Sequence, residues 1–508
     1  MSLQVSLLSR DPLRGQAQPA PSGVRLRAVS HSWTAVGGPD RAELRAEGSE
    51  EALAELASWL RCPVTIARPE GLPVWWGYLE GVWVRKGQVE IGASLDGMAN
   101  RVRVSYQPLP GGPRRFTAWL DDARSQRLYG VKELQARAAG TLRSLAGAES
   151  LAASLLAERA APPSSLHRAG AAASPSRGKQ GCEARLTARG WWHSLAWRAY
   201  SQPTGLEQNA AAASGSQGFG TPTAPMLRQS FVASAGAETW PADRVGLHLR
   251  KVGSPGDSVI VELRSALSGE LLSTGQIAAS SLSPGQGWVE VLLDPAAAVV
   301  PGMEYELRLR RSGSLDALNA YRVDHDLSAN REEGSFAWWN GGSWVEVQPP
   351  ASLLFKLAGT EDSLAQLRRM LLAGAGGQFL NGVESSASDG VSAGLWRDGQ
   401  SSAREEVERM LAMGTSEGRR LLARIDEYRR AVIWKAPLPG ERDYLLMSDG
   451  GVLDAFRRRI LPGECPVGVW AHGADIVALA PGGQETSPPA VWIERATWDE
   501  ERGRLELG

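Results

Sequence analysis

The sequence predicts a multidomain, mainly β protein with α+β parts, on three observations. The chain has 508 residues, which is too many for a single hydrophobic core. It contains 19 tryptophans and 57 glycines, and this combination favours sheets with tight turns and large rings at sheet faces or subunit contacts. Between residues 74 and 106 apolar and polar residues alternate and Val, Trp and Tyr are frequent, which is typical of antiparallel strands.

The N-terminal domain is predicted to combine strands with one helix. Alternating patterns predict strands over residues 3–8, 24–33 and 41–46. Ser49 can cap a helix over residues 49–60, because its hydroxyl oxygen can accept a hydrogen bond from the first turn. A Lys-Gly turn at residues 86–87 then predicts a Trp-rich hairpin. We therefore expect a small β-barrel or sheet with one helix packed against it.

A change to helical periodicity predicts helical runs over residues 124–143, broken at Tyr129-Gly130, and over residues 148–161. Two stretches rich in small residues, Pro and Ser, residues 162–181 and 209–225, are predicted to be linkers, because they cannot bury enough apolar surface to order themselves. They bracket a short ordered segment with four aromatic residues, residues 182–200.

Residues 226–357 are the clearest self-contained unit. Seven short alternating runs are separated by Ser-Pro-Gly and Gly-Ser turns, which predicts an antiparallel, jelly-roll-like β-sandwich. Beyond it the pattern is mixed, with helices expected over residues 361–372 and 403–413 and strands before and after residue 440. The predicted domains are, in order, the strand–helix domain, the helical and linker segment, the inserted sandwich, a second α+β domain and a C-terminal β segment, over residues 1–148, 149–225, 226–357, 358–452 and 453–508.

The composition of the chain argues against several classes of protein. The 55 basic and 56 acidic side chains give a net charge of -1, so no global basic field favours nucleic-acid binding. The cysteines, Cys62, Cys182 and Cys465, are odd in number and far apart, so no disulfide framework is expected. The N-terminus lacks the pattern of a signal peptide and no window resembles a membrane span, so we expect synthesis in a cytoplasm and no membrane span.

No sequence motif of catalysis is present: G-x-S-x-G, H-E-x-x-H, the P-loop and the Rossmann fingerprint are all missing. We therefore expect no enzyme and no catalytic residues. Asp324, His325 and Asp326 could act as metal ligands or as an acid–base pair, but in a strand His325 points away from the two carboxylates, so a structural role is favoured. His193, beside Trp191 and Trp192, is expected to be packed rather than catalytic.

Two further candidates concern ligands of the sandwich. Asp257, Glu262 and Asp324 could hold calcium, although Asp is also favoured in turns for backbone reasons. No cofactor or metal is otherwise expected. The second candidate is a group of three tryptophans, Trp338, Trp339 and Trp344. They could stack on sugar rings or could fill the core of the sandwich, and the core role is favoured.

Two stretches carry a resemblance to a known family: SLDGMANRVRVSY at residues 94–106 and DDARSQRLYGVKEL at residues 121–134. They are similar to the signature of tail-tip or baseplate hub proteins of long-tailed bacteriophages and prophages. Residues 190–209 and the chain from residue 360 onward resemble the continuation in such proteins. Residues 229–277 resemble a β-sandwich module of phage tail and surface-exposed proteins, and carbohydrate-binding jelly rolls share its general architecture.

The resemblance implies a homotrimeric hub in which each subunit contributes two tube-like β-barrel domains, so that three subunits present a pseudo-sixfold ring to a hexameric tail tube. Here the two blocks are residues 1–148 and 358–452, with the sandwich inserted between them. Implied partners are sister subunits, tail-tube and distal tail proteins, and also the tape-measure protein or host surface glycans. The implied location is the tail tip of a virion assembled in a bacterial cytoplasm.

The function expected from the sequence is therefore structural. The residues expected to serve packing and subunit interfaces are Trp75, Trp76, Asn100, Arg101 and Tyr129. The alternative is a carbohydrate-binding or carbohydrate-degrading surface protein that acts through residues 226–357.

Overall fold

The computed structural model divides into two compact units. Unit 1 consists of Met1–Tyr200, Leu367–Val391 and Gln400–Gly508, and unit 2 consists of Ser201–Gln366 and Ser392–Gly399, so unit 2 is inserted into unit 1. The structure describes the chain except for residues 1–2, 9–22, 87–88, 109–113, 141, 169–181, 201–205, 210–212, 235–238, 286, 328–333, 373, 395–400, 439–440, 442, 447–451, 455–466, 474–477, 480–484 and 487–490.

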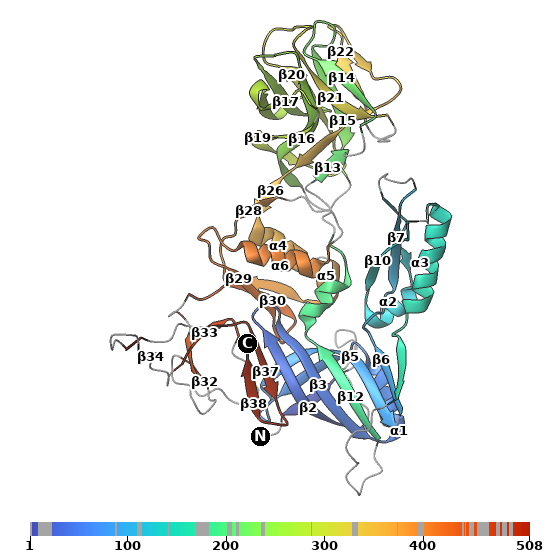
Figure 1. Ribbon diagram of the computed structural model, residues 1–508, viewed down its shortest axis with the longest axis vertical. Coiled ribbons are helices and arrows are strands. Elements are labelled where there is room, and N and C mark those ends of the chain that lie inside the picture. The colour runs from blue at the N-terminus through green and yellow to red at the C-terminus, as the bar shows by residue number, and fades with distance from the viewer. Residues whose placement is uncertain are drawn as a thin grey trace. The chain divides into compact units, whose positions relative to one another are not determined.

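Unit 1 is built on a curled antiparallel sheet, visible in Figure 1 around β2, β3, β5 and β12. Its order is β1-β4-β5-β12-β3-β2-β37-β38, and β6 and β11 extend it from β5. Early strands of the chain thus share one sheet with its last two strands. The bounds are β1 Gln4–Leu7, β2 Arg25–Thr34, β3 Gly38–Gly48, β4 Pro63–Ala67, β5 Pro73–Lys86, β6 Val89–Ser94, β11 Ser164–Arg168, β12 Cys182–Arg189, β37 Arg495–Asp499 and β38 Arg504–Leu507.

The predicted first helix forms and packs on this sheet. It comprises α1 (Glu50–Glu55) and a 3₁₀ turn (Leu56–Trp59), and the Ser49 hydroxyl accepts from Ala52 N at 3.3 Å, as predicted for the cap. Leu53, Leu56 and Leu60 are all buried, because the 3.6-residue period puts them on one face. The expected hairpin also forms, since Lys86 of β5 pairs with Val89 of β6.

The helical run predicted after residue 124 breaks at Tyr129-Gly130 as expected, but the prediction of a helix beyond this break is wrong. Helix α2 (Ala123–Tyr129) ends at Gly130, whose φ of 85° lies in the left-handed region. The chain then forms strand β10 (Glu133–Arg137), which pairs in parallel with β7 (Arg101–Tyr106). Helix α3 (Leu145–Arg159) forms as predicted and covers this small sheet, which also contains β8 (Arg115–Phe116) and β9 (Leu120–Asp121).

The two predicted linkers both contribute strands, and this corrects the prediction. Residues 164–168 form β11 on β6, and β14 (Gly215–Phe219) pairs with β21 of unit 2. A strand at a sheet edge needs backbone hydrogen bonds but few apolar side chains, so low-complexity composition does not exclude it. The remainder of the first linker, residues 169–181, lies outside the described residues.

The later part of unit 1 contains a three-stranded sheet in the order β27-β30-β29. It is joined to the main sheet, because Gly37 N donates to Ala423 O at 2.7 Å and Trp76 Nε1 donates to Ile425 O at 2.8 Å. The elements are α4 Ser363–Leu372, α5 Gly374–Phe379, β27 Gly382–Ser385, α6 Ala403–Met413, β29 Leu421–Ile425, β30 Arg430–Lys435, β31 Asp443–Leu446, β32 Val452–Asp454, β33 Val469–Gly473, β34 Ala478–Leu479, β35 Glu485–Thr486 and β36 Val491–Ile493.

Unit 2 is an antiparallel β-sandwich, and each of the seven predicted runs contains an observed strand. One sheet contains β13 Leu206–Asn209, β14, β16 Trp240–Val252, β19 Gly287–Val299, β21 Ala320–Asp326, β24 Ser352–Leu353 and β25 Phe355–Ala358. The other contains β15 Met226–Val232, β17 Ser258–Ser265, β18 Leu271–Ala278, β20 Glu304–Arg311, β22 Phe336–Trp339 and β23 Trp344–Glu346. The two are continuous, because β18 pairs with the later part of β19. Their inner faces form one core, and a short pair, β26 (Thr360–Asp362) and β28 (Ser392–Gly394), completes the unit.

The protein is therefore mainly β, with curled sheets in unit 1 and a sandwich in unit 2. Among the described helices, none has the length and apolar character needed to cross a membrane.

A buried carboxyl group lies at the junction of β2 and β37. Glu500, whose side chain is 13% exposed, lies 3.8 Å from His31 of β2. Burial, together with the negative charge of Asp499, raises the pKa of Glu500 from 4.5 to about 7. A carboxyl group with a raised pKa stabilises the fold while it is protonated, and that contribution is lost as the pH rises from 4.5 toward about 7.

We therefore expect Glu500→Gln, which imitates the protonated acid, to stabilise unit 1 at pH 8 by about 2–3 kcal/mol and at pH 5 by less than about 1 kcal/mol. Denaturant unfolding, with hydrogen-exchange mass spectrometry of peptides from β2 and β37, measures the change. Glu501→Gln, which removes an exposed contact to Arg27, is the control and should show no such growth with pH. A loss of stability at pH 8 would instead mean that Glu500 is ionised and paired with protonated His31.

Candidate functional site

The strongest candidate site is an outer face of the unit 2 sandwich. In β16, Val245, Leu247 and Leu249 are buried in the core, so alternation places the residues between them on the opposite face of the sheet. Pairing with β19 and β25 sets Trp288 opposite His248 and Lys356 opposite Gly246. We call this surface the Trp288 face; it is formed by Gly246, His248, Arg250, Trp288, Arg322 and Lys356.

Trp288 is the dominant side chain of this face. It is 40% exposed, although tryptophan is on average a well-buried residue. Lys356 Nζ lies 4.2 Å from the centre of its ring, and the ring of His248 lies 5.4 Å away at 65°. A Cβ at Gly246 would lie at an ordinary contact distance, 3.7 Å, from Trp288 Cε3. Paired strands thus hold an aromatic ring with a cation over one of its faces and an imidazole in edge contact with it.

His248 is oriented by a buried carboxylate. Its Nδ1 lies 2.5 Å from Oδ2 of Asp324, which is only 1% exposed. Since an ionised carboxylate only accepts hydrogen bonds, Nδ1 carries the proton in this contact and Nε2 is the remaining polar atom of the ring. This fixes the tautomer and the direction in which the imidazole meets a ligand.

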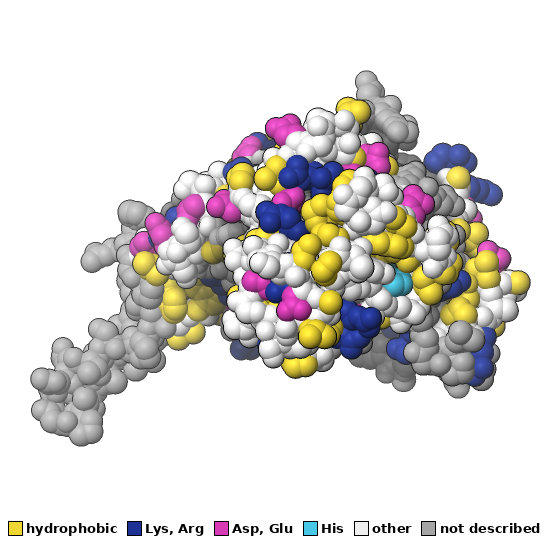
Figure 2. All heavy atoms as spheres, turned by 90° about the horizontal axis from the view of Figure 1, so that it is seen from above, with side chains coloured by type: hydrophobic (Ala, Val, Ile, Leu, Met, Phe, Trp, Pro, Cys, Tyr) yellow, Lys and Arg dark blue, Asp and Glu magenta, His cyan; other side chains and the backbone are white. Residues whose placement is uncertain are grey.

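Apolar surface patches bordered by basic side chains occur in several places on the molecule. On the side seen from above, hydrophobic side chains gather in several patches that have lysine or arginine side chains at their borders (Figure 2). Small apolar patches bordered by polar groups are typical of binding surfaces.

The sequence did not single out Trp288, although one signal could have found it. In the run GWVEVLL, Val289 and Val291 occupy the alternate positions that face the core, so Trp288 must face outward. An outward Trp in the middle of a well-formed strand is the informative observation.

The three tryptophans predicted as sugar-binding candidates lie on the hairpin of β22 and β23, in the other sheet. Trp338 packs against the core. The rings of Trp339 and Trp344 lie 5.5 Å apart at 65°, and the guanidinium of Arg228 lies 4.9 Å from the centre of the Trp344 ring. Trp339 and Trp344 are half-buried, and their part in sugar binding stays a prediction.

The carboxylates considered for calcium binding already bind other side chains of unit 2. Asp257 takes two hydrogen bonds from Arg311, at 2.6 and 2.9 Å, and Glu262 binds Arg264 and Arg310. Burial alone would raise the pKa of Asp257, but these bonds from Arg311 and others from Gly313 and Tyr321 hold it below its usual value. Within the part of the chain that the structure describes, no group of three or more His, Cys, Asp and Glu residues could hold a metal ion.

The run from Asp324 to Asp326 does not converge on one site. Asp324 binds His248 on the outer face, whereas the ring of His325 lies 5.6 Å from that of Phe336 on the core side. Asp326 accepts from the Ser214 hydroxyl at 3.3 Å. The alternation of a strand thus separates the imidazole of His325 from the two carboxylates.

Of the residues expected at interfaces, three are buried inside unit 1. Trp75 is 0% exposed, Trp76 8% and Asn100 0%, so these side chains serve the packing of the chain itself. Arg101 contacts Asp121 and Glu133 at 3.5 and 3.4 Å and is half-buried, as is Tyr129. Whether any of the five meets another subunit stays a prediction.

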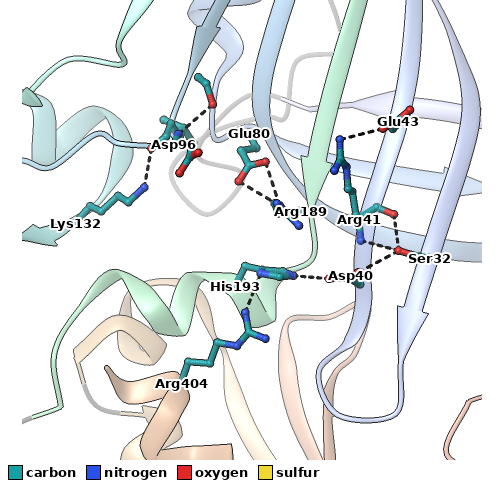
Figure 3. A network of polar contacts seen from close by, with 12 residues as sticks. Ser32, Asp40, Arg41, Glu43, Glu80, Asp96, Lys132, Arg189, His193 and Arg404 are labelled. Carbon is teal, nitrogen blue, oxygen red and sulfur yellow. Dashed lines mark hydrogen bonds and ion pairs between the residues drawn. The ribbon is translucent and has the colours of Figure 1, made fainter. Parts of the chain in front are cut away.

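Unit 1 contains a second candidate, a polar network around His193 (Figure 3). His193 lies in a 3₁₀ helix (Trp191–Trp197) that follows β12. Its Nε2 lies 2.8 Å from Asp40 Oδ1, and its Nδ1 lies 3.1 Å from Arg404 Nη1 of α6. Because arginine only donates, Nδ1 accepts and Nε2–H donates to Asp40. The imidazole therefore joins β3 to α6.

Asp40 gathers further donors. Ser32 and Arg495 donate to its Oδ2 at 3.2 and 3.0 Å. Burial would raise the pKa of Asp40, but the hydrogen bond from His193, the charge of Arg495 and the hydrogen bond from Ser32 hold it below its ordinary value. The Ser32 hydroxyl binds the carboxylate and not the imidazole, so no base is positioned to activate it as a nucleophile. The cavity beside the network has a volume of about 300 Å³. The network therefore serves the structure of unit 1, because it connects segments that are distant in sequence.

No protein-family model matches the chain, and no curated protein does. Among similar solved structures, a β-1,3-glucan-binding CBM6 from Bacillus halodurans is 16% identical with a TM-score of 0.14, over 24% of this chain and 92% of that one. CsCBM6-3 from Clostridium stercorarium, in complex with cellobiose, is 15% identical with a TM-score of 0.12, over 23% of this chain and 88% of that one.

A glycoside hydrolase family 43 arabinoxylan arabinofuranohydrolase from Bacillus subtilis, in complex with cellotetraose, is 9% identical with a TM-score of 0.16, over 56% of this chain and 63% of that one. All three TM-scores are low, and these similarities therefore support no inference about the ligand of this chain.

Proposed function

We propose that this protein is a non-catalytic carbohydrate-binding protein in which unit 2 binds sugar at the Trp288 face and unit 1 is the scaffold. The observation that carries the proposal is the 40% exposure of Trp288 on a rigid strand. A large apolar ring that is left in water loses the free energy that burial would provide, and a ligand that covers it recovers that free energy. The flat apolar face of a sugar ring fits such a plate.

The polar neighbours of Trp288 suit the other faces of a sugar. Lys356 supplies a donor over one face of the ring, and His248, held by Asp324, presents one further polar atom. A small number of well-placed polar groups around an aromatic surface is the usual composition of a small-molecule site. Because strand pairing and the Asp324 contact already fix these groups, little ordering free energy is lost on binding.

The test is a glycan array followed by calorimetry with the best ligand, using the full chain. Trp288→Ala is expected to lower the affinity about 30-fold or more, as for a central binding residue, while unit 2 stays folded. Trp344→Ala removes the same kind of side chain from the other sheet and is the matched control. Binding that survives Trp288→Ala unchanged, or a parent protein that binds no glycan, would contradict the proposal. Loss with Trp344→Ala alone would move the site to the β22–β23 hairpin.

We also propose that the protein is a structural component of a phage tail tip and that unit 1 assembles it into a homotrimeric hub. This proposal rests on the sequence resemblance, and the domain arrangement is compatible with it. Unit 2 leaves and rejoins unit 1, and unit 1 pairs β2 with β37 across the insertion, so the scaffold can carry the sandwich without interrupting its main sheet. Multi-angle light scattering should give the mass of a trimer, and negative-stain electron microscopy should show rings. A monomer at high concentration would contradict the hub but leave sugar binding untouched.

A further inference from the structure

Two arginines stand opposite one another on the Trp288 face. Arg250 of β16 pairs in register with Arg322 of β21, so their side chains leave the sheet on the same side. Directly opposed residues of antiparallel strands have Cβ atoms about 5 Å apart, and like charges at that spacing destabilise a sheet. A pair of this kind therefore costs stability unless an anion lies between the two side chains.

Neither guanidinium has a hydrogen bond or ion pair with any residue that the structure describes, and Arg250 Nε is buried without an acceptor. The other sheet of the same sandwich treats its arginines differently. There Glu306 binds Arg228 and Arg308, and Glu262 binds Arg264 and Arg310. Among the described residues, the arginines of one face thus have acidic partners, whereas the two on the Trp288 face have none.

The arginine pair lies on the same face of the sheet as Trp288 and close to it along β16. Arg250 follows His248 by two residues on the same face of β16, which is about 7 Å along the strand, and His248 pairs with Trp288. Lys356 lies beside Trp288 on the opposite side, level with Gly246. A sugar that stacks on Trp288 would therefore lie close to a lysine and to two arginines.

We infer that the ligand of the Trp288 face is an acidic saccharide whose anionic group is bound by Arg250 and Arg322, an inference that rests on the proposed sugar binding. The planar guanidinium forms paired hydrogen bonds with carboxylate or sulfate oxygens, which gives direction as well as attraction. An anion there would satisfy the buried Nε of Arg250 and relieve the repulsion between the two guanidiniums.

The experiment compares matched probes on the full chain by calorimetry: oligogalacturonate, the same oligosaccharide with its carboxylates methyl-esterified, and a sulfated galactan. We expect the charged probes to bind about tenfold or more tightly than the ester, and the advantage to shrink as salt is raised. The carboxylate and sulfate probes distinguish which anion the pair prefers.

Arg250→Gln/Arg322→Gln should remove the preference for charged probes, so that this variant binds the charged probes and the ester with the same affinity. Arg310→Gln, on the other sheet, is the matched control and should leave the preference intact. The double variant should also raise the thermal unfolding midpoint of unit 2, a readout that a merely structural arginine pair would move downward.

Equal binding of charged and esterified probes, unaffected by the double variant, would overturn the acidic ligand while sugar binding stands. Absence of binding to every probe and every array glycan would overturn both. Loss of the charged probes together with a lower unfolding midpoint would assign the arginines to the fold rather than to the ligand.

Discussion

Replacing Gly190 by alanine is expected to prevent unit 1 from folding or to destabilise it by at least about 3–5 kcal/mol. Gly190 lies between β12 and the Trp-rich 3₁₀ helix, and its N–H donates to Asp40 O at 2.9 Å. A Cβ at this position would lie 1.7 Å from Pro39 O and 2.6 Å from Pro39 C. Its φ of -61° is ordinary, so the requirement for glycine comes from space and not from backbone conformation.

The atoms in the way are backbone, which cannot rotate aside as a side chain would. The change should therefore separate β12 from β3 at the point where His193 meets Asp40. Soluble yield and denaturant unfolding measure the loss, and hydrogen exchange in β3 and β12 locates it. Gly382→Ala is the matched control, because no atom lies within 4 Å of its would-be Cβ, and it should be tolerated. A Gly190→Ala protein as stable as the parent would contradict the observed spacing of the two strands.

Asn100→Ala is expected to cost about 3–5 kcal/mol, because it leaves several buried polar groups unpaired. Asn100 is 0% exposed, and its Nδ2 donates to Ser125 Oγ at 3.1 Å and to Gly130 O at 2.8 Å. Its Oδ1 accepts from Lys132 N at 2.8 Å. One side chain thus ties the end of α2 and the start of β10 to β7.

Denaturant unfolding measures the loss, and faster hydrogen exchange in α2 and β10 should accompany it. The matched control is Asn381→Ala, an exposed asparagine of unit 1 whose Nδ2 donates to Tyr428 O at 2.8 Å, and it should cost less than about 1 kcal/mol. Equal effects at the two positions would mean that the Asn100 network is not what holds this region together.

Local patterns were sufficient for the elements whose signals lie within a few residues. Ser49 and the leucines after it predicted the first helix, and α6 lies where its periodicity placed it. The long strands of the sandwich were predicted because their alternation is strong. The sequence motif around Asn100 drew attention to the correct residue, although its role is to bind the backbone inside unit 1.

The remainder depends on partners that are remote in sequence. Strand β10 was predicted as helix, because its helical periodicity is real and only its pairing with β7 overrides it. The weak strands β11 and β14 exist because a neighbouring edge offers hydrogen bonds to them. His193 and Asp40, or Arg250 and Arg322, are brought together by pairings that no local pattern encodes. The candidate site could be predicted only as far as the outward position of Trp288.

The pairing of β2 with β37 has a consequence for the order of events during synthesis. Ser30 pairs with Asp499, so the two partners are separated by nearly the whole chain. Unit 2 is contiguous except for a short return segment, and it emerges from the ribosome before β37 exists. Domains generally fold as units during synthesis, and contacts of long sequence separation form late. Unit 2 should therefore be folded on the nascent chain while the edge of β2 is still unpaired with β37.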